Sequence, residues 1–195
     1  ELFLVEASDP GIEVIELTTV DKTRTSIELI LKNVDADLLS GSSDKSVIEK
    51  VLDAGRIMLA ADTVGAAQVM LDKSVAYSLE RKQFGRLIGS FQAVKHMCAE
   101  MAAELEPCHS MIWHAAHCFD NVPEEARLMA CQTKAHISEV GQQISKTATE
   151  VHGGMGFTDE LGLHYWFKRI GLNKQLLGSP ELIREEAGRL QGFDQ

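Results

Sequence analysis

The chain has 195 residues, 45% of them hydrophobic and 25% charged, which are ordinary values for a globular protein. Its formal net charge of −10 argues against a general binder of nucleic acids or membrane surfaces. No apolar run reaches the roughly 18 residues of a membrane-spanning helix, and no signal peptide is visible. Since the sequence begins with Glu1 inside a strand-like pattern, we expect a fragment or a processed C-terminal part of a longer protein.

Residues 1–40 have the pattern of short β-strands. The segments LFLVEA, GIEVIEL and TSIELILKNV alternate apolar and polar residues and are rich in Val and Ile. This alternation predicts three antiparallel strands. Because three short strands make a thin sheet, we expect them to belong to a larger one.

From about residue 44 the apolar residues return with the 3.6-residue period of an α-helix. The pattern predicts five helices, over residues 44–80, 91–119, 123–151, 161–177 and 180–191. The second is expected to be broken or kinked near Pro107, and the third opens on Pro123. Long helices joined by short turns imply an antiparallel bundle. The predicted fold is therefore mainly α, with a helical domain over residues 44–195 that follows a short β segment.

A basic and aromatic stretch, ERKQFGRLIGSFQ, separates the first two predicted helices. Arg81 is able to hold a phosphate through two parallel hydrogen bonds, Gln83 both donates and accepts, and Phe84 offers an apolar face to a base. The two glycines of the stretch allow close approach of the backbone. These properties suit a nucleotide that carries a diphosphate. Composition alone favours a simpler interpretation, a helix–helix turn in which Arg81 and Lys82 pair with nearby acidic residues.

A second stretch, ATEVHGGMGFTDE, places His152 and two glycines at the end of the third predicted helix. A glycine-rich turn lets backbone N–H groups face an anion. A single Gly-Gly-x-Gly is a weak signal, however. A simple helix stop, with His152 near the helix C-terminus, explains it equally well.

The two stretches together carry a resemblance. ERKQFGRLIGSFQAVKHMCAEM, followed later by ATEVHGGMGFTDELGLHYWFKR, resembles the C-terminal half of an acyl-CoA dehydrogenase. PGIEVIELTTVDKTRTSIELILKNVDADLLSG resembles the end of that family's middle β-domain, so residues 1–40 are expected to be that part. The resemblance covers nearly the whole chain, without the family's N-terminal helical domain and most of its β-domain.

The resemblance implies a cofactor, a substrate and partners. They are FAD, an acyl-CoA thioester, an electron-transfer flavoprotein, and a second subunit that is either a related chain or another copy of this one. No nucleic acid and no membrane span are expected. A cytoplasmic location is implied for a bacterium, or the mitochondrial matrix for a eukaryote.

The resemblance also implies site residues. Arg81, Gln83 and Phe84 match positions that touch the ADP part of a flavin held mainly by a neighbouring subunit, and Gly153 and Gly154 match a turn against the same diphosphate. Three further positions are assigned in the same way: Glu150 and Ser179 to the cofactor, and Arg56 to the substrate. The family usually has Gln where this chain has Glu150. A carboxylate is unfavourable beside a diphosphate unless it is protonated or turned away.

The usual catalytic base has no counterpart. Dehydrogenation of an acyl thioester needs a carboxylate that removes the α-proton while the flavin accepts the hydride. In the family this glutamate lies either in a Tyr-Glu-Gly-Thr stretch before the last helix or on the first bundle helix, one residue before an Arg. The matching residues here are Leu177 and Gly55, which precedes Arg56. Neither accepts a proton, so no catalytic residue is assigned.

Several interpretations follow from the missing base. We favour a subunit that works beside a related chain carrying the glutamate, as in bacterial heterotetrameric acyl-CoA dehydrogenases that resemble this one and often act on bulky thioesters, including steroid side chains. The alternatives are a complete homo-oligomeric dehydrogenase with a displaced base, a non-catalytic scaffold or regulatory homologue, and a flavoprotein with different chemistry.

Histidines and cysteines are crowded in the second predicted helix. His114 and Cys118 stand at the i, i+4 spacing that a metal uses. No second ordered pair accompanies them, so a structural or interfacial role is favoured and no metal ligand is assigned. None of the four cysteines forms a Cys-x-x-Cys pair, which indicates reduced thiols.

Overall fold

The computed structural model describes residues 1–193, which form two compact units. The first is Glu1–Leu52, and the second begins at Asp53. Within residues 1–193, no helix is long and apolar enough to cross a membrane.

The first unit contains two antiparallel strand pairs. They are β1 (Phe3–Val5) with β4 (Ala36–Leu38), and β2 (Ile12–Leu17) with β3 (Ser26–Leu31). The sequence pattern predicts β1, β2 and β3, whereas β4 was not predicted. The apolar side chains of β2 and β3 are largely exposed. A two-stranded pair of this kind is marginal by itself.

The helical part consists of five α-helices. They are α1 (Lys45–Glu80), α2 (Gln92–Asn121), α3 (Pro123–His152), α4 (Leu163–Gln175) and α5 (Pro180–Leu190). These bounds agree with the predicted helices to within two residues at each end. Of the predicted break or kink near Pro107, the break is wrong, because α2 continues through this residue, and the kink stays a prediction. Leu105 and Cys108, which flank Pro107, are fully buried, and their packing offsets the hydrogen bond that a proline removes.

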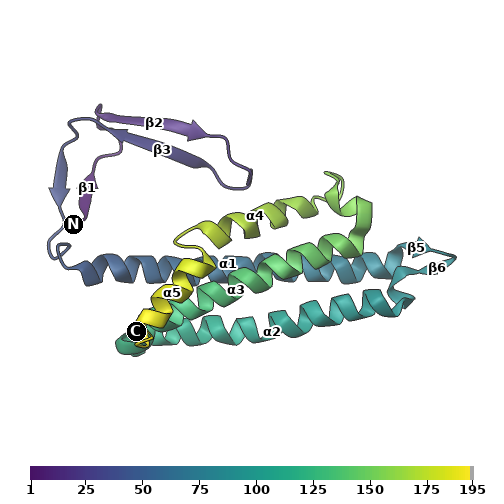
Figure 1. Ribbon diagram of the computed structural model, residues 1–195. Helices are drawn as coiled ribbons and strands as arrows, with labels where there is room; N and C mark the ends of the chain where they lie inside the picture. The colour runs from purple at the N-terminus through teal and green to yellow at the C-terminus, as the bar shows by residue number, and fades with distance from the viewer. Residues whose placement is uncertain (194–195) are drawn as a thin grey trace. The chain divides into compact units, whose positions relative to one another are not determined.

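The core of the bundle lies between α1, α2, α3 and α4. Its buried side chains include Met70, Met101, Leu105, Ile144 and Leu163. Helices α1 and α3 approach closely at Gly141, where an added Cβ would lie 2.5 Å from Thr63 Cγ2. Figure 1 shows α1, α2 and α3 lying alongside one another, with strands β5 (Lys82–Gln83) and β6 (Arg86–Leu87) at the end where α3 passes into the 3-10 turn η2 (Gly153–Phe157).

Candidate functional site

The basic stretch folds as a tight β-hairpin rather than as a plain helix–helix turn. Lys82 pairs with Leu87, and Gln83 with Arg86. The two central residues, Phe84 and Gly85, both have positive φ angles, of 52° and 77°. Two positive φ angles define the type I′ turn, which matches the twist of short hairpins. A bulky residue is strained in this region, and such strain is concentrated at functional sites.

The base of the hairpin is fixed to the end of α1. Arg81 N–H donates to Tyr77 O at 2.9 Å, and Ile88 N–H donates to Arg81 O at 2.8 Å. Gly89, in the 3-10 turn η1 (Ile88–Ser90), lies so close to α1 that a Cβ there would be 2.8 Å from Ser78 O. Only glycine permits this approach.

Aromatic contacts support the tip of the hairpin. Phe84 meets Phe91 edge to face at a centroid distance of 6.1 Å, and the guanidinium of Arg86 lies 3.9 Å from the Phe91 ring. Phe84 is nevertheless 92% exposed. The hairpin therefore presents an apolar ring to solvent, and Arg81, at its base, does not take part in these aromatic contacts.

The C-terminus of α3 faces this hairpin. Gly153 ends the helix with φ 58° and ψ −139°, a conformation that favours glycine strongly. His152 stacks on Tyr77 with ring centroids 4.6 Å apart. Its Nδ1 lies 2.7 Å from Ala148 O, and because a carbonyl only accepts, Nδ1 carries the proton. In the neutral ring, Nε2 is then an acceptor.

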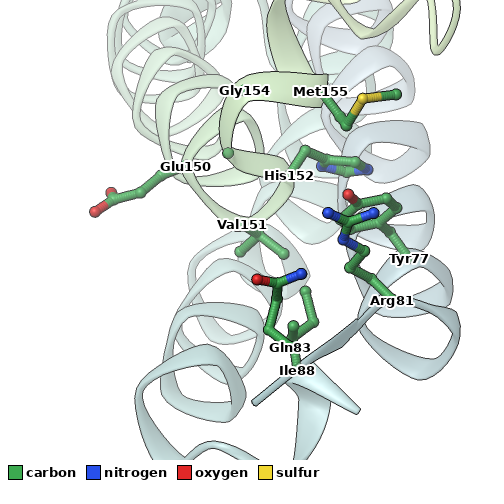
Figure 2. A pocket seen from close by; sticks show the side chains of 10 residues that line it. Tyr77, Arg81, Gln83, Ile88, Glu150, Val151, His152, Gly154 and Met155 are labelled. Carbon is green, nitrogen blue, oxygen red and sulfur yellow. The ribbon is translucent and has the colours of Figure 1, made fainter. Parts of the chain in front are cut away.

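The hairpin and the C-terminal end of α3 line a cavity of about 390 Å³ that is open to solvent (Figure 2). Its lining is Tyr77, Arg81, Gln83, Ile88, Glu150, Val151, His152, Gly153, Gly154 and Met155. Within residues 1–193, the Arg81 guanidinium has no ion-pair partner. A Cβ on Gly153 or Gly154 would meet nothing within 4 Å, so the backbone of the turn is open to the cavity. Figure 2 shows the Glu150 side chain pointing away from Arg81 and His152.

Five of the cofactor positions named from the sequence line this one cavity: Arg81, Gln83, Glu150, Gly153 and Gly154. Phe84 lies at the hairpin tip, outside the lining. Ser179 immediately precedes α5 and does not line the cavity either. The contacts of all these residues with a cofactor remain predictions.

The two base positions named from the sequence lie together elsewhere in the bundle. Gly55 is on α1, and Leu177 is in the loop between α4 and α5 with a positive φ of 58°. A Cβ built on Gly55 would lie 2.5 Å from Leu177 Cδ1. The neighbouring Arg56, only 7% exposed, donates from Nε to Leu177 O at 3.2 Å.

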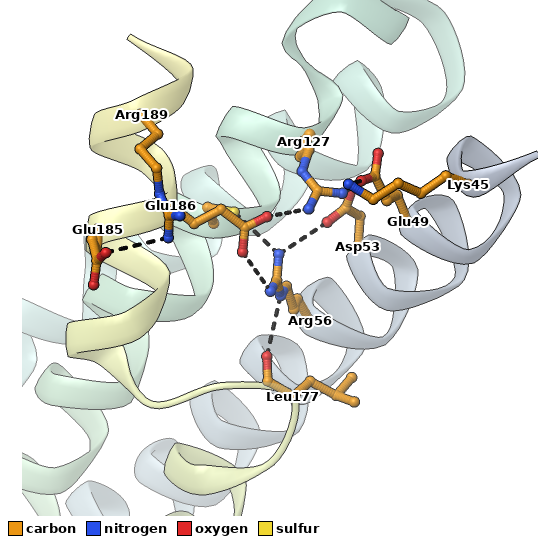
Figure 3. Close-up of polar contacts among 10 residues, drawn as sticks. Lys45, Glu49, Asp53, Arg56, Arg127, Leu177, Glu185, Glu186 and Arg189 are labelled. Carbon is orange, nitrogen blue, oxygen red and sulfur yellow. Dashed lines mark hydrogen bonds and ion pairs between the residues drawn. The ribbon is translucent and has the colours of Figure 1, made fainter. Parts of the chain in front are cut away.

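Arg56 is also the centre of a buried ion network (Figure 3). Its Nη1 lies 3.2 Å from Asp53 Oδ1 and its Nη2 lies 2.8 Å from Glu186 Oε2. Arg127 pairs with the same two carboxylates. The predicted contact of Arg56 with substrate remains a prediction, since each nitrogen of its guanidinium already has a partner in the protein.

The carboxylates of the network are not free bases. Burial raises the pKa of Asp53, although Arg127 and Arg56 oppose this. Burial alone would raise the pKa of Glu186. The hydrogen bond and the charge of Arg56 outweigh burial, so the pKa of Glu186 is lowered. A lowered pKa and two arginine partners leave Glu186 a weak proton acceptor.

The sequence analysis did not assign the other five lining residues, of which Tyr77 and His152 carry polar side chains. Tyr77 precedes Arg81 by one helical turn, and this spacing was a usable signal. His152 was noted at the helix end but not assigned to the site, because its stacking partner lies far away in the sequence.

The chain matches known proteins over most of its length. Residues 45–190 match the family model described as Acyl-CoA dehydrogenase, C-terminal domain. The chain is 40% identical over 111 residues to the caffeyl-CoA reductase–Etf complex subunit CarC of Acetobacterium woodii, covering 57% of this chain and 29% of that protein. It is 34% identical over 139 residues to acyl-CoA dehydrogenase IpdE2 of Mycolicibacterium smegmatis, covering 71% and 42% respectively.

A solved structure agrees over almost the whole chain. A Tcur3481–Tcur3483 steroid ACAD variant is 28% identical, with a TM-score of 0.87 over 98% of this chain and 51% of that one. The chain therefore spans 29% and 42% of the two curated relatives and about half of the solved chain.

Proposed function

The chain belongs to the acyl-CoA dehydrogenase family, and from this membership we propose that it is part of a FAD-dependent enzyme that introduces an α,β double bond into an acyl-CoA thioester. In this proposal the chain supplies flavin contacts and an oligomer interface, while a related partner chain supplies the base. The similar Tcur3481–Tcur3483 structure carries the names of two gene products, which is consistent with such a pairing.

The contact between Gly55 and Leu177 carries this proposal. We infer from the resemblance that Gly55 and Leu177 occupy the two positions at which the family holds its base. Neither side chain titrates, and Leu177 fills the space that a side chain on Gly55 would need. The nearest acids of the network, Asp53 and Glu186, are held by arginines. A base from another chain accounts for both observations.

The residues of the cavity fit the diphosphate of FAD. Within residues 1–193, no carboxylate pairs with the Arg81 guanidinium, Gln83 offers an amide, and the backbone at Gly153 and Gly154 is open. If FAD binds there, Arg81 would neutralise phosphate charge through two parallel hydrogen bonds. The Gly153–Gly154 turn would add backbone N–H donors. The cofactor, when bound, supplies the hydride acceptor. This chain orients it and keeps one end of it out of water.

Two further parts of the proposal concern partners and domains. The name of CarC places that relative in a complex with an Etf, and we propose an electron-transfer flavoprotein as the electron partner here. We also propose that residues 1–40 complete the middle β-domain of a longer assembly. The exposed apolar side chains of β2 and β3 support this, since a hairpin cannot bury them by itself.

The partner hypothesis is tested by purifying the chain alone and together with any related chain encoded beside it. The readouts are visible flavin absorbance and its bleaching by acyl-CoA. We expect full flavin and bleaching only in the mixed complex. Turnover by the chain alone would contradict the partner base.

The cavity is tested separately with Arg81→Ala in the complex. We expect the variant to lose flavin on gel filtration while its circular dichroism is unchanged. Lys82→Ala is the matched control, because Lys82 is an exposed cation on the same hairpin that does not line the cavity. Equal flavin retention in the two variants would favour the scaffold alternative, in which no flavin lies near Arg81.

A further inference from the structure

The turn between α2 and α3 brings together three side chains of different chemistry. His114 and Cys118 lie one turn apart near the end of α2, and Glu125 lies in the first turn of α3. The turn is fixed by its backbone: Val122 N–H donates to Cys118 O at 2.9 Å, and Glu125 N–H donates to Val122 O at 3.0 Å. One ligand atom from each of His114, Cys118 and Glu125 lies within 4.8 Å of the others.

From this convergence we propose that His114, Cys118 and Glu125 form a binding site for a zinc-class divalent metal ion. Zn–S and Zn–N bonds of about 2.3 and 2.05 Å at a tetrahedral angle place sulfur and nitrogen about 3.5 Å apart. The observed distance from Cys118 Sγ to His114 Nε2 is 3.7 Å. Binding therefore needs only a small adjustment of this pair.

The donor set selects the kind of ion. Thiolate and imidazole favour Zn²⁺ and Co²⁺, whereas Mg²⁺ and Ca²⁺ prefer oxygen ligands. Three protein ligands leave a fourth position for water. Cys118 is 1% exposed and forms the floor, while His114 and Glu125 are exposed, so the ion enters from the solvent side. As the Sγ–metal bond forms, the thiol proton passes to solvent.

The surrounding charge favours a cation. The sequence between Lys95 and Arg127 contains no Lys or Arg, and Asp120 and Glu124 flank the cluster. The charge of Arg127 is balanced by its ion pairs with Asp53 and Glu186. The bound ion would join α2 to α3 at their connection and so stabilise this helical hairpin by mass action.

The sequence analysis assigned no metal because no second ordered pair accompanies His114 and Cys118, and a third ligand was not considered. Glu125 supplies it, and the signal was present in the sequence. Pro123 starts α3 immediately after α2, and a short turn of this kind places the first turn of the second helix beside the last turn of the first.

The test uses Co²⁺ as probe on the purified protein, in the assembly in which it purifies and with its thiols reduced. We expect one Co²⁺ per chain, a near-ultraviolet thiolate-to-cobalt band, loss of the band when Zn²⁺ is added, and a higher melting temperature with Zn²⁺. Cys118→Ser should abolish the band, whereas Cys108→Ser, a buried cysteine outside the cluster, should retain it.

Substitution of the two exposed ligands is a second test, because changes at exposed positions are less prone to unfold the protein than a change at the buried Cys118. His114→Ala and Glu125→Gln should each weaken Co²⁺ binding, while His109→Ala and Glu124→Gln, on neighbouring exposed positions, should not. A wild-type protein without the thiolate band, or a band that survives in Cys118→Ser, would show that the cluster is only a thiol–imidazole contact. Because this assay needs neither flavin nor thioester, its outcome is independent of the proposed enzymatic function.

Discussion

Leu177 fills the space that a side chain on Gly55 would need, since a Cβ on Gly55 would lie 2.5 Å from Leu177 Cδ1. The two residues come from α1 and from the loop before α5, yet they converge on one point. The two base positions that we propose from the resemblance therefore converge on one place in the bundle. A carboxylate introduced at either position would reach it.

We predict that Leu177→Glu introduces proton abstraction. Leu177 already has a positive φ, and its carbonyl accepts a hydrogen bond from Arg56, so a glutamate on the same backbone adds no strain that leucine does not already have. In the flavin-containing complex, with the partner chain's own base replaced by a residue that does not titrate, exchange of the acyl-CoA α-proton with deuterated water should rise by roughly 10²-fold, at the lower limit for a general base. Leu176→Glu is the control, and equal exchange in both variants would contradict the placement.

Substitution of Gly55 tests the contact itself. Gly→Ala in a helix normally stabilises by about 0.5–1 kcal/mol. Gly65→Ala, on the same helix with open space around it, should show this gain in urea unfolding. Gly55→Ala should gain less, because Leu177 has to move. Equal gains would mean that Leu177 rotates away without cost.

We predict that Arg56→Ala is severely destabilising. It leaves the buried Asp53 and the partly buried Glu186 without their central partner, and removal of one member of a buried pair costs about 3–5 kcal/mol. Arg184→Ala is a control of opposite expectation, because Arg184 and Glu139 form an exposed pair worth about 0–1 kcal/mol. Urea unfolding of both variants measures the loss of unfolding free energy. Similar losses would mean that the Arg56 network contributes no more than an exposed ion pair.

Local signals in the sequence predicted most of the helical fold. Pro123 and Gly153 bound α3 because proline suits a first turn and glycine a helix end, and both act through their own backbone. The hairpin was not predicted, since nothing in the residue type of Phe84 signals a positive φ. The composition of the stretch showed that it is basic but not that its two strands pair.

The site was predicted only where it depends on short motifs. Arg81 and Gly153 come from motifs, and the structure places them in one cavity. The ion network depends on Arg56 meeting Glu186, residues that are distant in the sequence, and no single-sequence pattern records that meeting. Tertiary packing alone creates such pairs.

Lys134 should make stability depend on alkaline pH. Its Nζ is buried and donates to Ser138 Oγ at 3.0 Å and to Asn173 O at 2.7 Å, at the end of α4. Burial, together with the charge of Arg56, lowers its pKa from 10.5 to about 8. Between these values the unfolded chain binds more protons than the folded one, so the free energy of unfolding rises with pH.

The test compares unfolding free energies across that pH range. The increase should disappear in Lys134→Met, which removes the titrating group but keeps the length of the side chain. Lys146→Met, an exposed lysine on the same helix, should retain it. Parallel curves for the wild type and Lys134→Met would show that Lys134 has an ordinary pKa.

Gly89→Ala should push the base of the hairpin away from α1 by steric clash. A Cβ would lie 2.8 Å from Ser78 O, a backbone atom that cannot rotate away, and overpacking of this kind costs about 1–3 kcal/mol. Because the hairpin carries Arg81 and Gln83 to the cavity, the variant should also retain less flavin. Gly171→Ala, with open space around it, should gain about 0.5–1 kcal/mol and keep its flavin. Unchanged stability and flavin content in Gly89→Ala would mean that the hairpin is not held by this close approach.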